Sequence, residues 1–384
     1  VAVLCQPVYV VIPAVTTLLI KLLPRQKTLY AAKPSPWRLG LWWLLALPQV
    51  VFELMAQHTS EISSKLPIWT RPVVAGDSVA FYLGKFLLPI GVGPDYGRSP
   101  FLVTSHWWSY FMWTIPVILY LLSLPRRGTT QSWYQLALMI FLALILPISG
   151  LFYFAAQSHS TVSNRYAYLA LLGPVVALAY FITKSKRTLP VLITLVAIGL
   201  SAWITHRDIK FWQSDEALWP HALVVNPGSP IAHQMLGNKA YQDGDWSAAR
   251  QHYRAVVAAN VLDASVYSNL AQIEHQHGDP QDAAQYYASA LQLNPNLSGM
   301  HRQLGEVFLV MNAGDKALEH LRSAVQENPD DLASARQLGI LYVRQEQYDL
   351  AIPYLTKVVE SGARDTETAE ARALLGKALF STNQ

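Results

Sequence analysis

Residues 263–296 read DASVYSNLAQIEHQHGDPQDAAQYYASALQLNPN. Three further stretches of the chain align with them without gaps, at a period of about 34 residues. In each stretch a leucine is followed at once by a small residue, and an alanine follows at a constant spacing. Small residues at fixed positions let two helices approach closely, so the pattern predicts stacked helical pairs. These positions are Leu236, Leu270, Leu304 and Leu338, then Gly237, Ala271, Gly305 and Gly339, and finally Ala249, Ala283, Ala317 and Ala351.

The period and the small-residue positions resemble those of the tetratricopeptide repeat, in which two-helix units stack into a solenoid. Each unit buries its apolar face against its neighbours, so partial units are expected at the two ends. Residues 211–384 are therefore predicted to form an all-α solenoid. Its predicted parts are a half-unit at 214–226, four units at 229–262, 263–296, 297–330 and 331–363, and a terminal helix at 366–380.

The first 210 residues have a different composition. They hold 17 lysines and arginines against 5 aspartates and glutamates, whereas residues 211–384 hold 12 against 20. Residues 79–92 form a short apolar stretch that is interrupted by Gly84, Lys85 and Pro89, which favours an interfacial or re-entrant segment. Six longer apolar stretches have about the length of a membrane span, namely residues 1–23, 39–55, 107–124, 133–154, 166–183 and 189–205.

Six spans place the three basic clusters of this part on one side, which the positive-inside rule assigns to the cytoplasm. The predicted fold class is thus all-α, with a polytopic transmembrane helical domain at residues 1–210 followed by the solenoid. We expect an integral protein of the inner (cytoplasmic) membrane that carries its repeats in the periplasm or otherwise outside the cytoplasm. Nucleic acid is not an expected partner, because the basic residues follow the membrane topology.

Motifs of soluble enzymes are absent from the sequence, including a glycine-rich phosphate loop, HExxH and CxxC. His275 and His277 are two residues apart on a predicted helix, where side chains diverge, so no metal site is predicted. No cofactor is predicted either. Protein binding is the expected role of the repeats.

The concave face of such a solenoid is lined by first-helix residues two before and two after the repeated leucine. This rule selects Arg302 and Arg336, which occupy equivalent positions in adjacent units. The two arginines could clamp an acidic or C-terminal carboxylate of a peptide. The alternative is that they are solvated side chains of an acidic domain. The other groove residues are Gln234, Asn238, Ser268, Gln272, Glu306 and Ile340.

Two predicted outward loops are rich in polar residues. Residues 85–100 read KFLLPIGVGPDYGRSP, and residues 158–169 read SHSTVSNRYAYL. Sugar transfer from a lipid phosphate would need cations that hold the phosphate at the membrane surface and a carboxylate that deprotonates the acceptor. Arg165 supplies a cation at the expected depth.

These two segments, the order of the apolar stretches and the repeats resemble the GT-C superfamily of membrane glycosyltransferases, in particular bacterial relatives of the transmembrane-and-tetratricopeptide protein O-mannosyltransferases. The resemblance implies transfer of a sugar from a polyprenyl-phosphate donor to a protein acceptor outside the cytoplasm. It also implies that Arg165 binds the donor phosphate, with Tyr166 and Tyr168 at the start of that helix. Lys85, Asp95 and Tyr96 would flank the donor, so membrane lipid is an expected partner.

The resemblance further implies a pair of acidic catalytic residues in a first outward loop, and this chain is expected to begin beyond that loop. Asp77 and Asp95 are the aspartates of the outward loops in the first 210 residues, and neither stands in an acidic pair. Catalytic residues are therefore not assigned, and enzyme activity stays open. The alternative function is a noncatalytic, membrane-anchored scaffold whose repeats recruit a partner to an envelope complex.

Overall fold

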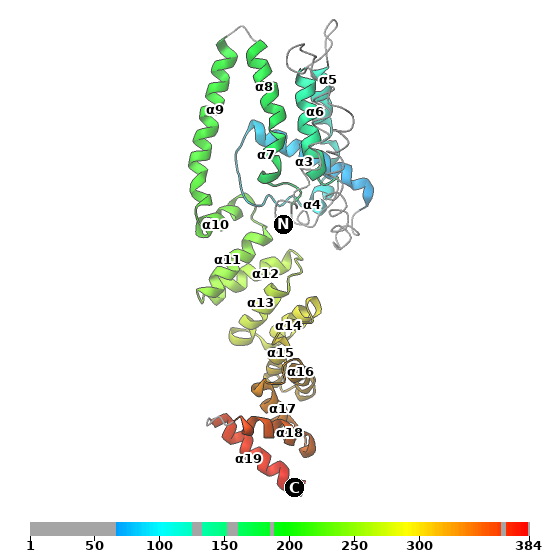
Figure 1. The fold of residues 1–384 in the computed structure, drawn as a ribbon, viewed down its shortest axis with the longest axis vertical. Coiled ribbons are helices and arrows are strands. Elements are labelled where there is room, and N and C mark those ends of the chain that lie inside the picture. Colours follow the sequence, from blue (N-terminus) through cyan, green and yellow to red (C-terminus); the bar gives the residue numbers. More distant parts are fainter. Residues whose placement is uncertain (1–66, 125–132, 152–159, 185–187, 362–365, 383–384) are drawn as a thin grey trace, which may run out of the picture. The chain divides into compact units, whose positions relative to one another are not determined.

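The computed structural model describes residues 67–124, 133–151, 160–184, 188–361 and 366–382. The predicted spans at 1–23 and 39–55 lie outside these residues. All regular structure within the described ranges is helical (Figure 1). The chain divides into two compact units, residues 1–229 and residues 230–384.

The second unit contains the four predicted repeats and the predicted terminal helix, whereas the predicted half-unit at 214–226 lies in the first unit. Its four helical pairs are unit one (α11, Pro230–Gln242; α12, Trp246–Ala258), unit two (α13, Ala264–His277; α14, Pro280–Leu293), unit three (α15, Met300–Val310; α16, Gly314–Glu327) and unit four (α17, Leu332–Arg344; α18, Tyr348–Glu360). The second helix of each of the first three units also contacts the first helix of the next unit, and α19 (Thr366–Ser381) packs against α17 and α18. The predicted all-α repeat fold is confirmed.

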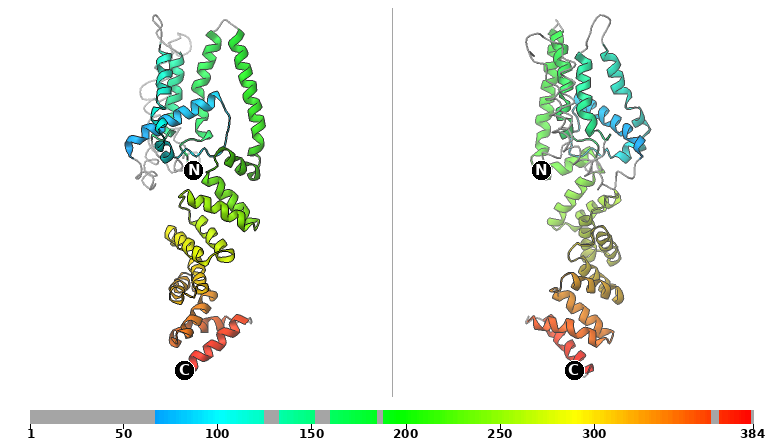
Figure 2. Two further views of the ribbon diagram at one scale, coloured as in Figure 1. Left: turned by 180° about the vertical axis from the view of Figure 1, so that it is seen from behind. Right: turned by 45° about the vertical axis from the view of Figure 1, so that its right-hand side comes forward.

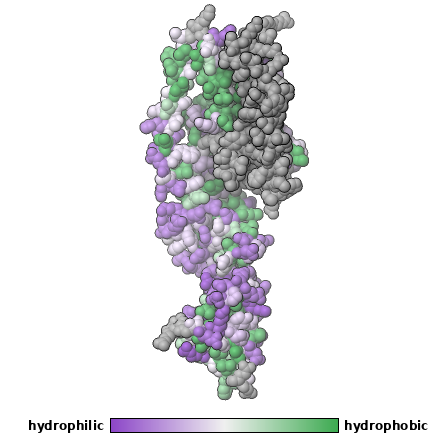
Figure 3. Space-filling model, in the orientation of Figure 1, coloured by the Kyte–Doolittle hydropathy of each residue, from purple (hydrophilic) through white to green (hydrophobic). Residues whose placement is uncertain are grey.

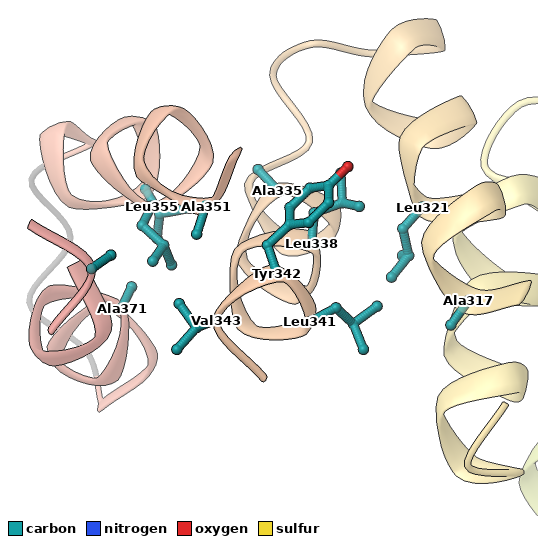
Figure 4. Close-up of a cluster of buried hydrophobic side chains, with 12 residues drawn as sticks. Ala317, Leu321, Ala335, Leu338, Leu341, Tyr342, Val343, Ala351, Leu355 and Ala371 are labelled. Atoms are coloured by element: carbon teal, nitrogen blue, oxygen red, sulfur yellow. The ribbon is translucent and has the colours of Figure 1, made fainter. Parts of the chain in front are cut away.

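The repeated small residues have a direct steric reason. A Cβ atom added to Gly305 would come within 2.7 Å of Leu321, and one added to Gly339 would come within 2.5 Å of Leu355. Leu321 and Leu355 are fully buried on the second helices of units three and four. A glycine therefore lets each second helix reach the core of its own unit. Figure 4 shows this core for the last two units, with Leu338 and Leu355 among the buried side chains.

The turns within three of the units carry a second periodic feature. Gly244, Asn312 and Glu346 occupy the same position of units one, three and four, and their φ angles are positive at 76°, 55° and 61°. Glycine adopts this left-handed conformation freely, and asparagine tolerates it, whereas glutamate is strained there. The turn of unit four is thus built on an unfavourable residue.

The first unit consists of helices of very different lengths, from 3-10 helices of three residues to α9 with 21 residues. They are η4 (Ile68–Thr70), α3 (Arg71–Leu87), α4 (Pro100–Ser105), η5 (Trp107–Phe111), α5 (Thr114–Ser123), α6 (Trp133–Ile145), η6 (Leu146–Ile148), α7 (Asn164–Ala170), α8 (Leu172–Lys184), α9 (Thr188–Asp208), η8 (Ile209–Trp212) and α10 (Asp215–Val225). The core of this unit lies around Ile140 and Phe141 of α6, against Val79 and Tyr82 of α3. α6 and α8 are closely packed, since a Cβ on Gly173 would lie 2.5 Å from the carbonyl oxygen of Ala137.

Two helical segments of the described residues are long and apolar enough to cross a membrane, Ala167–Lys184 and Thr188–Trp212. They overlap the predicted spans at 166–183 and 189–205. α8 and α9 run alongside each other in both views of Figure 2. Only 6% of the most apolar window of the Thr188–Trp212 segment is buried, although its mean hydropathy is 1.9. Figure 3 shows apolar surface gathered over this region.

Three predicted segments differ from the structure. The stretch 107–124 is divided into η5 and α5, and the stretch 133–154 is helical as α6 only to Ile145 before a short 3-10 turn. Pro116 lies in the first turn of α5 and Pro147 lies in η6, and a proline lacks the N–H that a helix continuing from the preceding turn needs. In the stretch 79–92, α3 continues through Gly84 and Lys85 to Leu87 and begins earlier than expected, at Arg71.

Candidate functional site

Two cations of the first unit share one aromatic ring. Nζ of Lys85 lies 5.5 Å from the centre of the Phe81 ring, and Cζ of Arg98 lies 5.0 Å from the same centre. Tyr96 adds a second ring 5.0 Å from Nζ of Lys85, and Trp108 adds one 5.6 Å from Cζ of Arg98. Cation–π contacts hold a positive charge in place without neutralising it. We call Phe81, Lys85, Tyr96, Arg98 and Trp108 the cation cluster.

Lys85 occupies the last turn of α3, one turn after Phe81 on the same face of the helix. Its ammonium donates hydrogen bonds to the carbonyl oxygens of Ile90 and, at 2.9 Å, of Gly91. Burial, and then the charge of Arg98, lowers the pKa of Lys85. Among the described residues Lys85 forms no ion pair. Its contacts are thus with backbone carbonyl oxygens and aromatic rings.

Arg98 has an internal partner. Its guanidinium lies 3.3 Å from both carboxylate oxygens of Asp77, a residue of α3 that is 1% exposed. Burial raises the pKa of Asp77, while the charges of Arg98 and His106 act in the opposite direction. With one carboxylate and two cations, the cluster keeps a net positive charge when Asp77 is ionised.

Asp95 has a structural role that differs from donor binding. One carboxylate oxygen accepts hydrogen bonds from the Ser229 hydroxyl at 2.6 Å and from the Asn226 amide at 3.2 Å. The other accepts from the backbone N–H of Gly97 at 2.8 Å. Asp95 is 4% exposed. These bonds hold the loop to the residues that follow α10, and none of them reaches Lys85.

The residues on either side of Asp95 face two different parts of the first unit. A Cβ on Gly93 would lie 3.1 Å from Val225, and one on Gly97 would lie 2.6 Å from Asn226, so both glycines permit close contact with the end of α10. Tyr96 instead packs edge-on against Phe81, at 4.9 Å. Residues 93–98, which we call the strap, therefore join α10 on one side and the cation cluster on the other.

The two polar loops predicted from the sequence meet in the structure. The backbone N–H and the hydroxyl of Thr161 each donate to the Arg98 carbonyl at 2.9 Å. The Tyr82 hydroxyl accepts from the N–H of Ser163 at 2.8 Å and donates to its carbonyl at 3.0 Å. These bonds place the start of α7 beside α3 and the strap.

Arg165 and Tyr166 lie in the first turn of α7, directly after Ser163. Their side-chain positions are outside what the structure describes. Tyr168 is 80% exposed, so it is available to an external partner. Of the residues predicted for donor binding, Lys85 and Tyr96 are in contact, and Asp95 is directed elsewhere. Sequence reasoning missed Phe81, although its place one helical turn before Lys85 was a usable signal.

The predicted groove arginines of the solenoid are both engaged with carboxylates. Arg302 lies 3.9 Å from Asp331, the N-terminal cap of α17, and Arg336 lies 3.1 Å from Glu367 of α19. These contacts link each unit to the next element. The paired carboxylates compete with a peptide carboxylate, which weakens the clamp hypothesis. The two arginines also differ from the alternative of solvated side chains, because both form ion pairs within the solenoid.

The polar groove residues have different surroundings. Asn238 accepts a hydrogen bond from the Tyr253 hydroxyl at 2.8 Å, which holds its amide in place. Gln272 is half-buried. A cavity of about 610 Å³ adjoins Arg302, and its lining is mainly polar and acidic. Its lining residues include Asn296, Arg302, Glu327, Asn328, Asp330 and Asp331.

Comparison with known families identifies the second unit. A family model described as tetratricopeptide repeat matches residues 235–298 and 336–384, and a second with the same description matches residues 274–341. Residues 235–384 are tetratricopeptide repeats. Such repeats stack into extended concave surfaces that bind proteins and peptides. No curated protein matches the chain.

Solved structures of tetratricopeptide proteins resemble the chain at low identity. YrrB, titled a protein with an unusual peptide-binding site, is 18% identical with a TM-score of 0.38 and covers 51% of this chain and 98% of its own. MamA is 20% identical with a TM-score of 0.36, over 41% of this chain and 91% of its own. PilF of Pseudomonas aeruginosa is 20% identical with a TM-score of 0.35, over 48% of this chain and 87% of its own.

Proposed function

We propose that the protein is a multi-pass protein of the bacterial cytoplasmic membrane whose first unit binds the phosphate of a polyprenyl-phosphate sugar. In this proposal its tetratricopeptide repeats bind the acceptor protein outside the cytoplasm, and the protein is part of a GT-C type glycosyltransferase. The observation that carries the proposal is the cation cluster, where Lys85 and Arg98 share Phe81 beside the start of α7. Two cations in a partly desolvated site attract an anion more strongly than the same charges do in water.

The membrane part of the proposal is supported by the exposure of α9. The core helix of a soluble protein is mostly buried, whereas only 6% of the most apolar window of Thr188–Trp212 is buried. Exposed apolar side chains such as Leu192, Val196 and Trp203 recur along it. In water these side chains would cost about 25 cal/mol per Å² of apolar surface. A lipid environment removes this cost.

The position of the cation cluster also suits a membrane surface. Large apolar side chains near the cluster are exposed, namely Leu87, Leu88, Ile90, Phe101 and Trp107. A lysine at such an apolar surface extends its ammonium toward lipid phosphates. The polar cluster and the apolar surface together fit a ligand with a charged head and a long hydrocarbon chain.

The proposal is tested by binding of polyprenyl phosphate to the full chain in lipid nanodiscs. Lys85→Gln should weaken binding about tenfold or more, because one charge-assisted contact to phosphate is lost. Lys210→Gln is the matched control, since Nζ of Lys210 also lies over a phenylalanine ring, Phe211, at 4.9 Å. Equal binding by both variants and the unmodified chain would exclude the cluster as the phosphate site.

Sugar transfer is tested separately, with a polyprenyl-phosphate sugar and membrane protein as acceptor. We expect transfer to depend on Arg165, so that Arg165→Ala abolishes it. Binding of a partner by the repeats without any transfer would favour the second candidate, a membrane-anchored scaffold. That candidate is supported by the repeats, because tetratricopeptide repeats form concave surfaces that suit protein binding irrespective of catalysis.

The location of the repeats is tested by thiol labelling in intact cells. Cys5 is the single cysteine of the sequence, so Cys5→Ala leaves a clean background. A cysteine introduced at Ala288, an exposed position of α14, should react with a membrane-impermeant maleimide. Labelling that requires cell lysis would place the repeats in the cytoplasm and contradict the proposal.

A further inference from the structure

Two pairs of histidines recur at equivalent places in alternate repeats. In unit one, Nδ1 of His233 lies 3.0 Å from Nδ1 of His252, and in unit three, Nδ1 of His301 lies 3.0 Å from Nδ1 of His320. The second pair occupies the positions two repeats after those of the first. Each pair joins the first helix of its unit to the second. The four rings are all partly buried.

The same positions in the other units carry no titrating imidazole. In unit two they hold Tyr267 and Tyr286, whose ring centres are 6.3 Å apart. In unit four they hold Ala335 and Tyr354. An aromatic contact is thus sufficient for packing at this position. The histidine pairs add a property that packing does not require, which is the ability to change charge near a pH of about 6.5.

A separation of 3.0 Å between two ring nitrogens matches a hydrogen bond that contains one proton. One histidine must donate from Nδ1 while the other accepts there, so neutral and singly protonated pairs can both form the bond. Two imidazolium ions cannot, because both Nδ1 atoms would then carry hydrogen. Double protonation replaces an attractive contact with repulsion between partly buried charges.

We propose that the two histidine pairs are pH-sensitive contacts that keep units one and three closed at neutral pH and loosen them in mild acid, while units two and four do not respond. The loosened helices α11 and α15 carry the groove residues Asn238 and Arg302. Acid would therefore weaken the hold of these two units on a bound protein. This inference is independent of any glycosyltransferase activity.

The charged groups around the first pair have partners of their own. On α12, Arg250 and Arg254 lie 3.1 and 3.0 Å from Glu274 of α13. On α11, Lys239 lies 3.2 Å from Asp243. Burial of the ring, and then the charge of His233, lowers the pKa of His252.

The second pair has carboxylates nearby. Nε2 of His301 lies 3.5 Å from Glu327. Burial, and then the charge of His301, lowers the pKa of His320, and Glu319 opposes them. His320 also stacks on Phe308 at 5.5 Å. On α15 and α16, Lys316 lies over the Phe308 ring, and Arg302 contacts Glu306 and Asp331. The other charged groups of these helices and of the adjacent α14 and α17 are Asp282, Asp315, Arg322, Arg336 and Arg344.

The direction of the pH effect follows from proton binding. An unfolded histidine has a pKa of about 6.5. The pKa values of His252 and His320 are lowered in the fold. At a pH between the folded and the unfolded pKa of these histidines, the unfolded chain therefore binds more protons than the folded chain. The stability of units one and three therefore declines as the pH falls below about 6.5, and the decline ends once the folded pKa values have been passed.

The test is hydrogen exchange with mass spectrometry on the full chain in nanodiscs, at pH 7.5 and pH 5.5, after correction for intrinsic exchange rates. We expect protection of α11, α12, α15 and α16 to fall by about threefold or more at the lower pH, since local opening sets the exchange rate. Peptides of α14, α17 and α18, which contain no histidine, serve as internal controls. Equal changes in all four units, or no change in any, would overturn the proposal.

A variant separates the histidines from other acid effects. The double substitution His233→Tyr and His252→Tyr copies the residues of unit two, so the aromatic contact is retained without the titrating groups. It should abolish the acid response of unit one and leave that of unit three. If the double variant does not fold, the single substitution His252→Gln leaves one imidazole in the pair, so two imidazolium ions can no longer face each other. Persistence of the acid response of unit one in a folded variant would contradict the proposal.

A divalent metal held between the two rings is the competing explanation. Groups of three or more side chains that could hold a metal ion are absent from the described part of the chain, so each pair would supply two ligands only. Hydrogen exchange measured at pH 7.5 with Zn²⁺ and with a chelator distinguishes a bound metal from a shared proton. No effect of either supports the proton-sharing contact, and protection by Zn²⁺ that is lost in the tyrosine variant would overturn it.

Discussion

The Ser229 hydroxyl donates a 2.6 Å hydrogen bond to the carboxylate of Asp95, which lies 134 residues earlier in the chain. Both residues are buried, and Ser229 is the last residue of the first unit. The bond fixes the strap, and the strap carries Tyr96 and Arg98 of the cation cluster. The geometry of the cluster therefore depends on a contact outside it.

Loss of this bond should loosen the strap. Ser229→Ala leaves a buried carboxylate with one partner fewer, and a hydrogen bond to a charged group contributes about 1.5–3 kcal/mol. We expect faster proteolytic cleavage within residues 93–98 and a lower melting temperature of the full chain. Ser289→Ala, where the hydroxyl bonds only within α14, is the control and should change neither. An unchanged cleavage rate in Ser229→Ala would show that the bond does not hold the strap.

A glycine in the strained turn of unit four should stabilise the protein. Glu346→Gly relieves a left-handed glutamate, a conformation that costs an ordinary residue about 1–2 kcal/mol, while glycine adds entropy to the unfolded chain. The net expected gain in the free energy of unfolding is about 0.5–1 kcal/mol. Gly244→Ala at the equivalent turn of unit one should have the opposite sign, because its Cβ meets open space and only the conformation is strained. Chemical denaturation of both variants measures the difference.

Replacing glycine by alanine at two positions of the repeats should change the stability of the protein in opposite directions. Gly339→Ala places a Cβ against Leu355 in the core of unit four, and overpacking of this kind costs about 1–3 kcal/mol. Gly376 lies within α19 with open space around its Cβ position. Gly376→Ala should therefore stabilise the chain by up to about 1 kcal/mol through helix propensity. Denaturation curves in which both variants shift in the same direction would refute this packing argument.

Asp263, the N-terminal cap of α13, should contribute to the free energy of unfolding in a way that depends on pH. Burial raises the pKa of Asp263, but hydrogen bonds from Ser265 and Gln234 outweigh it, so the pKa lies below its ordinary value. The stabilisation is present above the unfolded pKa of about 3.9 and is lost as the pH falls through the folded pKa. Asp263→Ala should cost about 1 kcal/mol at pH 7, and this cost should become smaller as the pH falls below about 3.9. A cost that stays the same as the pH falls would exclude this origin.

The two parts of the chain differ in how far their sequence predicted them. In the repeats, Leu338 and Gly339 have counterparts at every period, so helices and core positions could both be inferred from the pattern. In the first unit no period exists, and apolar composition alone did not reveal where Pro116 and Pro147 would interrupt helices. The length of an apolar stretch does not show such breaks, whereas a proline within it does.

The candidate site shows the same division. Lys85 and Tyr96 could be selected as polar residues of an apolar loop, and the structure brings them together. Asp95 could be selected for the same reason, yet its carboxylate binds Ser229 and Asn226. A sequence shows which groups can carry charge, whereas the direction of a side chain depends on partners that are distant in the chain.

By itself the sequence determined the repeat, its all-α fold and the close contacts of its glycines, because these follow from interactions between residues at most one period apart. Tertiary structure alone decided that Asp77 lies against Arg98 and that residues 93–98 connect α10 to the cation cluster. It also decided that His233 meets His252. Contacts of this kind arise from the packing of separate elements, and no local pattern encodes which side chains that packing will bring together.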